Sequence, residues 1–225
     1  MFDGAIEAGN KAISNIGTIK MYGAKRNRRS RLRAQALKKE MMIIVDQDMD
    51  WKAGDKIYLA PTGHGHLSSD YAEIVSYDAS SGHCKIKDEL KYNHFGDNES
   101  TAGKLSGIDR RGEVVLLTRN VRIEGDDFDD WGGQIVTSDT IDTNGEMQAG
   151  LLEMSDVELY RCSQRDTHKA AIRFEAAMTK TQILNGVVAH QGKGWGLSIK
   201  SSSNVKITES SFIGFYMFGM SISAS

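Results

Sequence analysis

Three side chains in the last third of the chain could support acid–base chemistry on a polysaccharide. Arg173 and Glu175 alternate along one short strand, so both should point away from the apolar residues beside them. His190 follows in a later strand. Glycan cleavage needs two groups of different acidity placed across the scissile bond, whereas this set holds one carboxylate, one guanidinium and a distant imidazole. We expect an outward salt bridge and no catalysis; if the protein is an enzyme, these three residues are the candidates.

Four histidines raise the question of a metal site. His64 and His66 flank a glycine, and His83 and His94 lie downstream. Zinc needs three or four ligands that converge at roughly 2.0–2.3 Å, and a His-Gly-His pair in a glycine-rich loop has no fixed third ligand. We therefore expect a solvated loop and no bound metal.

An acidic segment at residues 124–130 carries the carboxylates that calcium prefers. Its spacing does not match an EF-hand loop, because the required alternation of acids before a glycine is missing. We expect an acidic surface turn, with calcium binding as the weaker alternative. The candidate calcium ligands are Asp126, Asp127, Asp129 and Asp130.

The densest run of positive charge lies at residues 25–33. It contains no aromatic residues for base stacking, and the whole chain has a formal charge of −2, so nucleic acid is not expected as a partner. In an extracellular protein the run would suit a sulfated glycan or an acidic protein; a solvated stretch is the alternative. The candidate residues are Lys25, Arg26, Arg28, Arg29, Arg31 and Arg33.

Signals for disulfides, glycosylation and membrane insertion are sparse. Cys84 and Cys162 are the only cysteines, so two buried free thiols are expected, with a mutual disulfide as the alternative. Asn98 begins an Asn-Glu-Ser sequon that is a glycosylation candidate in a secreted protein. No apolar run approaches the roughly 18 residues of a membrane span, the first residues lack a signal-peptide pattern, and we expect no cofactor.

Short strands must position these residues. The chain has 23 glycines and one proline, and short alternations of Val, Ile and Leu are separated by clusters of Gly, Asn, Asp and Ser. This composition predicts an all-β fold. Only residues 28–42, rich in Arg, Ala, Leu and Lys, indicate a helix, and they lack a clear apolar face. In the front half, Trp51 is expected to cap a core layer.

The end of the chain contains an internal repeat. Residues 171–177, 196–202 and 219–225 share one pattern of small, apolar and polar residues, at steps of 25 and then 23 residues. Second strands lie between them, with Ile183 predicted to match Ile207 at a step of 24 residues. An earlier copy is predicted where Val157, Glu158, Leu159 and Tyr160 alternate.

A repeat of this length with a two-residue apolar period predicts a right-handed parallel β-helix, a solenoid whose coils stack. Ile172, Leu197 and Met220 should form one column, at about 4.8 Å per step. Because coils are not stable alone, and the third copy ends without a polar cap, we expect a fragment of a larger protein. Residues 1–115 are predicted to be an irregular β-rich segment with loop insertions that begins the β-helix region, and residues 116–225 its coils.

The order of segments along the chain resembles the region of fibrocystin and fibrocystin-L that follows their eight-glycine domain. Each motif is weak alone, but together they cover nearly the whole chain in the expected order. The resemblance implies an extracellular parent, membrane-anchored or secreted and associated with cilia, with a right-handed β-helix here. The matching segments are residues 9–13 and 17–23, DWKAGD (50–55), LAPT (59–62), LKYNHFG (90–96), LLTRNVRIEG (116–125), WGG (131–133), ELYRC (158–162) and GKGWG (192–196).

The same region occurs in cell-surface hyaluronidases, where a coil carries a His-Phe-His motif at the proposed active site. The matching residues here are Arg173, Phe174 and Glu175, so both histidines are missing. We therefore expect a structural or adhesive segment of a large cell-surface protein rather than an enzyme. A hyaluronidase-like enzyme and a non-catalytic glycan-binding module are the alternatives. Expected partners are other domains of the same parent chain, other extracellular proteins and glycans.

Overall fold

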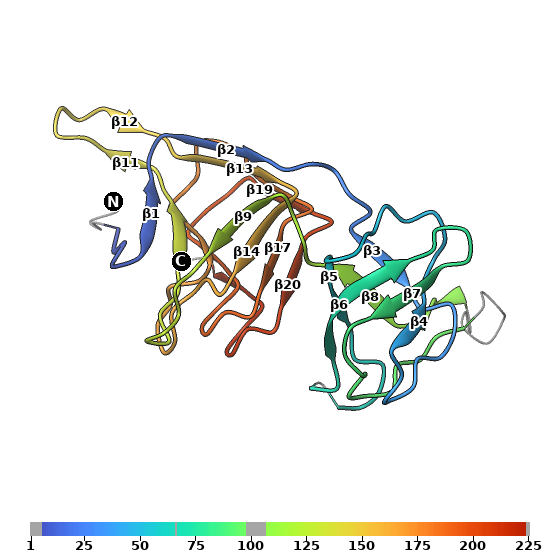
Figure 1. Cartoon of the computed structure of the whole chain (residues 1–225). Helices are drawn as coiled ribbons and strands as arrows, with labels where there is room; N and C mark the ends of the chain where they lie inside the picture. Colours follow the sequence, from blue (N-terminus) through green and yellow to red (C-terminus); the bar gives the residue numbers. More distant parts are fainter. Residues whose placement is uncertain (1–5, 66, 98–106, 224–225) are drawn as a thin grey trace. The chain divides into compact units, whose positions relative to one another are not determined.

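The protein is all-β in the computed structural model, which describes residues 6–65, 67–97 and 107–223 (Figure 1). These residues contain no α-helix, and therefore no helix able to cross a membrane. The chain forms two compact units, residues 1–24 with 119–225 and residues 25–118. We call them the circuit unit and the inserted unit. The expected division near residue 115 lies close to the second boundary, but the first 24 residues belong with the second half, because their strands pair there.

The circuit unit consists of three parallel sheets and one small hairpin (Figure 1). The first sheet contains β1 (Ala12–Asn15), β10 (Gln134–Thr137), β15 (Ile172–Glu175), β18 (Leu197–Lys200) and β21 (Met220–Ser223). The second contains β2 (Thr18–Tyr22), β13 (Leu151–Ser155), β16 (Gln182–Asn185) and β19 (Val205–Thr208). The third contains β9 (Val121–Glu124), β14 (Val157–Tyr160), β17 (Val188–His190) and β20 (Ser211–Ile213).

The chain visits the three sheets in a constant rotation, from the first to the second to the third. The inserted unit interrupts this rotation between β2 and β9, and the antiparallel hairpin of β11 (Thr140–Ile141) and β12 (Met147–Gln148) interrupts it between β10 and β13. Both interruptions lie at turns, so the parallel pairing of the sheets continues across them.

The predicted column of apolar residues is confirmed. Ile172 pairs with Leu197, and Leu197 with Met220, in parallel register. The column extends backward through Ile135 to Ile13. The sequence did not reveal these two earlier copies, because the hairpin and the inserted unit lengthen the circuits that precede β15 and β10.

The predicted step of 24 residues for the second strands is wrong by one residue. Ile207 pairs with Leu184 rather than with Ile183. Since neighbouring strand residues face opposite sides, a slip of one residue reverses every side chain, and the structure buries Leu184 while Ile183 remains half-buried. The predicted early copy at residues 157–160 is β14 of the third sheet, and it pairs in parallel with β17, one circuit later.

The inward side chains of the three sheets form one apolar core, and each fully buried aliphatic or aromatic side chain stabilises it by roughly 1.5–3 kcal/mol. Its fully buried members include Leu152, Met154, Leu159, Ile172, Phe174, Leu184 and Leu197.

The inserted unit is a six-stranded antiparallel sheet in the order β3-β8-β5-β6-β7-β4. Its strands are β3 (Arg29–Arg31), β4 (Met42–Ile44), β5 (Lys56–Leu59), β6 (Asp70–Tyr77), β7 (His83–Ile86) and β8 (Glu113–Leu116).

The helix indicated at residues 28–42 is wrong. Its first residues form β3, which pairs with β8, and its last residue begins β4. Leu32 and Ala36 are buried in the core of this unit, so strand pairing and burial override local helix propensity. Trp51 packs in the same core and donates its indole N–H to the Asn27 carbonyl at 2.7 Å, which confirms its predicted core position.

Candidate functional site

The candidate pair Arg173 and Glu175 forms the expected salt bridge, with 2.6 Å between Nη2 and Oε1. Both residues lie on β15, on the face opposite Phe174. The pair points away from the core, as expected, but it is not open to solvent, because the Arg173 side chain is 0% exposed. A glycan chain therefore has no access to this guanidinium as the structure stands.

Residues 6–10, which we call the N-terminal strap, account for this burial. Arg173 Nη1 donates to the side-chain Oε1 of Gln134 at 2.7 Å and to the Glu7 carbonyl at 3.1 Å. Gln134 Nε2 donates to the Ala8 carbonyl at 2.7 Å. Lys169 pairs with the Glu7 carboxylate at 3.1 Å and thereby lowers the pKa of Glu7.

The third candidate, His190, lies in another sheet. Its Nε2 is 3.1 Å from Glu158 Oε1, and both side chains are buried. Glu158 is also 3.5 Å from Nε of Arg122, and the His190 ring packs beside Tyr160. The structure thus does not bring His190 together with Arg173. Its partner Glu158 was not predicted from the sequence, although Glu158 alternates with the inward residues of its strand.

The histidines of the inserted unit do not converge on a metal site. His94 is buried, with Nε2 2.9 Å from Asp70 Oδ2 and Nδ1 3.0 Å from the Ala60 carbonyl. His64 is exposed, and His83 contacts Ser81 at 2.9 Å. His66 lies outside the described residues. Within the described ranges no group of three metal-binding side chains is found.

Two of the four candidate calcium ligands, Asp129 and Asp130, are paired with separate cations. Asp129 is 2.7 Å from Lys11, which lowers the pKa of Asp129. Asp130 pairs with Arg165 at 3.1 Å and with Lys193 at 3.5 Å. Asp126 Oδ1 accepts the main-chain N–H of Phe128 at 3.3 Å, and Asp127 lies in the same turn.

The basic run is largely matched by carboxylates of its own unit. Arg26 contacts Asp55 at 2.7 Å and Asp50 at 3.0 Å. Arg29 and Arg31 both pair with Glu113, at 3.1 and 3.8 Å. This leaves less free positive charge than the sequence indicates. Polyanion binding by the basic run stays a prediction. Of its remaining residues, Lys25 is exposed, and Arg28 and Arg33 are half-buried. The sequon at Asn98 lies outside the described residues.

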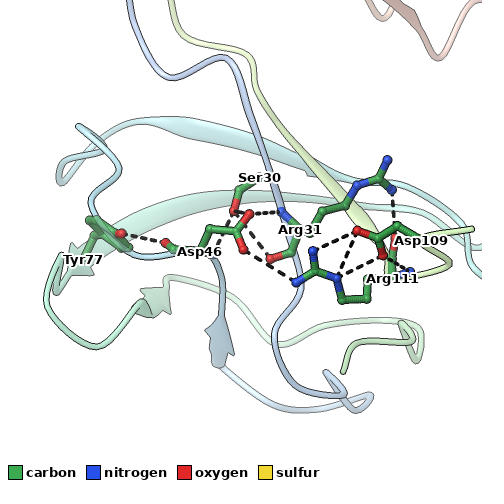
Figure 2. Close-up of polar contacts among 6 residues, drawn as sticks. All are labelled: Ser30, Arg31, Asp46, Tyr77, Asp109 and Arg111. Atoms are coloured by element: carbon green, nitrogen blue, oxygen red, sulfur yellow. Dashed lines mark hydrogen bonds and ion pairs between the residues drawn. The ribbon is translucent and has the colours of Figure 1, made fainter. Parts of the chain in front are cut away.

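Figure 2 shows why Arg31 is structural. Its main-chain N–H donates to Asp46 at 2.9 Å, and its guanidinium donates to the Arg111 carbonyl at 2.9 Å. Arg111 in turn binds Asp109 at 2.8 Å and, by this hydrogen bond, lowers the pKa of Asp109 to about 2. Tyr77 donates to the Asp46 carbonyl at 2.8 Å. The network connects distant segments of the inserted unit, and neither aspartate was predicted from the sequence.

Exposed aromatic rings lie on two of the turns that join the third sheet to the first. Arg165 lies 4.6 Å from the Tyr216 ring centroid and pairs with Asp130, so two turns are linked through one guanidinium. Rings provide apolar faces for sugars, and the charged groups beside them provide hydrogen-bond partners for hydroxyls. We call these rings the ring surface; they lie in the turn between β9 and β10 and in the turn between β20 and β21, and they were not predicted from the sequence. Its members are Phe128, Trp131, Tyr216 and Phe218.

Glycines allow these turns to stack closely. A Cβ at Gly132 would lie 1.9 Å from the Arg161 carbonyl oxygen, and one at Gly194 would lie 2.3 Å from that of Gln164. Any side chain there would collide with the main chain of a neighbouring circuit. The WGG and GKGWG segments are therefore explained by packing between circuits.

Both cysteines are buried free thiols, as expected, and they form no disulfide. Burial raises the pKa of Cys84 and of Cys162 to about 12. Since the thiolate is the reactive form, we expect no labelling of either thiol by Ellman's reagent at pH 8 in the native protein, and two labelled thiols in urea. Rapid labelling of one thiol in the native protein would contradict this burial.

Asp139 fixes the base of the hairpin. Burial alone would raise its pKa, but hydrogen bonds from Thr179 and from the main-chain N–H groups of Met178 and Gly150 lower it. A lowered native pKa stabilises the fold above the unfolded-state pKa, about 3.9, and this contribution is lost as the pH falls through the native pKa.

We therefore expect Asp139→Asn to lower the stability of the circuit unit by about 1–2 kcal/mol at pH 7. The difference from the natural protein should shrink below pH 4. Urea unfolding at pH 7 and at pH 3 measures both values, and a difference that does not change with pH would rule out the carboxylate as its cause.

Comparison with known proteins gives sequence relatives along most of the chain. Fibrocystin-L of Mus musculus is 35% identical over 98 residues, which cover 43% of this chain and 2% of that protein. Fibrocystin of Canis lupus familiaris is 25% identical over 213 residues, or 93% of this chain and 5% of that protein. Cell surface hyaluronidase CEMIP2 of Homo sapiens is 24% identical over 58% of this chain and 10% of that protein.

No family model matches the chain. Among solved structures, the tailspike protein gp49 from Pseudomonas phage LKA1 is similar with a TM-score of 0.34 and 10% sequence identity, covering 92% of this chain and 39% of that one. The chain thus spans between 2 and 10% of the length of the three sequence relatives.

Proposed function

Because the chain is fibrocystin-like in sequence, we propose that it is a segment of right-handed parallel β-helix with a structural and adhesive role in a large extracellular protein of the cell surface, including the surface of cilia. The observation that carries this proposal is the unbroken register from Ile13 through Ile172 to Met220 along one sheet. Such a stack forms a rigid spacer, because every circuit covers the apolar face of the one before it.

The last described circuit suggests where the rest of the parent binds. Met220 and Ile222 continue the inward columns of Leu197 and Ile199, yet both are exposed. Exposed core positions of this kind call for an apolar cover. We assign this cover to another part of the same parent protein, consistent with the small share of the relatives that the chain spans.

The ring surface favours a second candidate function, a glycan-binding module without catalysis. Its rings and paired charges lie on turns that project from a rigid stack, which is a suitable arrangement for a long glycan. We expect the natural protein to be retained on immobilised hyaluronan, and a Trp131→Ala, Tyr216→Ala double variant to lose most of that retention. A control variant at Lys25 and Arg28 should bind as the natural protein does; loss with the control alone would assign binding to the basic run.

Catalysis is not part of the proposal, since Arg173 is covered and His190 lies in another sheet. Incubation with high-molecular-weight hyaluronan should leave its size unchanged on gel filtration. Size reduction that disappears in Glu175→Ala would replace this proposal with the hyaluronidase-like alternative.

A further inference from the structure

A polar patch lies on the outer face of the first sheet and on the turn before β15, and the chain itself covers it. Its members are Gln134, Lys169, Arg173 and Glu175, and the first three are almost fully buried, with exposed fractions of 2, 8 and 0%. Two cations and an amide rarely become this inaccessible on an outward sheet face without a bound group. Here the bound group is the N-terminal strap.

The strap fills the patch with one carboxylate and three main-chain carbonyls. Lys169 binds the Glu7 carboxylate at 3.1 Å, and Arg173 binds the Glu7 carbonyl at 3.1 Å. Gln134 donates to the Ala8 carbonyl at 2.7 Å, and Gln164 donates to the Asn10 carbonyl at 2.9 Å. The patch therefore contacts both the main chain and the acidic side chain of a short peptide.

The polar contacts of the strap are hydrogen bonds to its main-chain carbonyls and one ion pair. Residues 6–10 belong to no strand, and Glu7 is 67% exposed at its side chain. An ion pair as exposed as this one is weak and is screened by salt. Gly9 has a φ of 71°, a conformation that side-chain-bearing residues rarely adopt. The strap can thus be released by single substitutions that leave the core untouched.

We infer that this patch is a binding site for an acidic peptide, occupied in this structure by the chain's own strap. Amide donors matched to main-chain carbonyls favour a peptide over a polysaccharide, and the lysine supplies the preference for an acidic residue. The strap competes with any external peptide, so the apparent affinity is reduced by the fraction of molecules in which the patch is covered. This site is independent of the proposed structural role, which would stand if the site were disproved.

The test uses the full chain and a fluorescein-labelled peptide with the sequence of residues 6–10, Ile-Glu-Ala-Gly-Asn, followed by fluorescence anisotropy. Glu7→Lys repels Lys169, and Gly9→Pro forbids the positive φ of the strap. We expect each variant to bind the peptide at least tenfold more tightly than the natural protein. Lys169→Ala combined with either variant should reduce that gain, and a peptide with Gln in place of Glu should bind about two- to fivefold more weakly, as expected for a partly exposed ion pair.

Three results would overturn the inference. The first is equal peptide affinity of both released variants and the natural protein. The second is peptide binding that does not change with the Glu-to-Gln exchange. The third is a labelled hyaluronan oligosaccharide that binds the released variants when the peptide does not. Circular dichroism of each variant verifies that the sheets are intact, and because the two substitutions release the strap by different means, either one suffices for the test.

Discussion

Gly192→Ala is expected to destabilise the circuit unit by about 3 kcal/mol, because an added methyl group overpacks a closely stacked interior. A Cβ at this position would lie 2.1 Å from the Cys162 carbonyl oxygen of the neighbouring circuit. The main chain must move to accept it, and Phe215 stands 2.5 Å away on another side. Hydrogen exchange measured at increasing urea concentrations, with each peptide resolved by mass spectrometry, gives the free energy of unfolding of this unit alone.

Gly17→Ala is the matched control for this change. Nothing lies within 4 Å of a Cβ at Gly17, so the same substitution should change the free energy of unfolding by less than about 0.5 kcal/mol. If both variants were equally stable, close stacking of the turns would be wrong as the explanation of the GKGWG segment.

Phe174→Ala is expected to destabilise the same unit by about 3–5 kcal/mol, the usual cost of removing a large buried aromatic side chain. Phe174 lies inward on β15, is fully buried, and packs in the core beside Ile172 and Leu197. Because the core is closely packed, neighbouring side chains cannot fill the space that the ring leaves, and an apolar cavity remains. Hydrogen exchange of the circuit-unit peptides again gives the change in free energy.

Phe128→Ala serves as the control, since Phe128 is 98% exposed. It should change the stability by less than about 0.5 kcal/mol. A comparable loss in the two variants would place Phe174 outside the core. The expected result would mean that Phe174, the middle residue of the segment that matches His-Phe-His, stabilises the core of this chain, independently of the roles of Arg173 and Glu175.

The positions of the two insertions follow from the way the circuits pair. Each sheet strand pairs with strands of other circuits, so a turn can be replaced without breaking the ladder. The inserted unit returns the chain at β9 in register with β14, and the hairpin returns it at β13 in register with β2. The chain can therefore contain inserted segments while the strand pairing of the circuit unit stays continuous.

The sequence by itself determined the β class, the column of Ile172, Leu197 and Met220, and the burial of Trp51. These features depend on residue type and on spacing along the chain, since an alternating apolar pattern commits one face of a strand to the core. The resemblance to fibrocystins also rested on sequence alone, because ordered motifs are a property of the chain.

Only the tertiary structure decided the one-residue register of Leu184, the strand at residues 29–31 and the membership of the first 24 residues in the circuit unit. Each depends on a partner strand far away in the sequence, and strand partners are chosen by the burial they achieve together.

The predicted and observed arrangements differ most at the candidate site. Sequence alternation correctly set Arg173 and Glu175 on one face of a strand, but it could not show that the strap covers that face or that His190 belongs to another sheet. Whether an outward charge meets solvent depends on which distant segment lies over it. That contact forms only when the chain has folded, so a local sequence pattern cannot predict it.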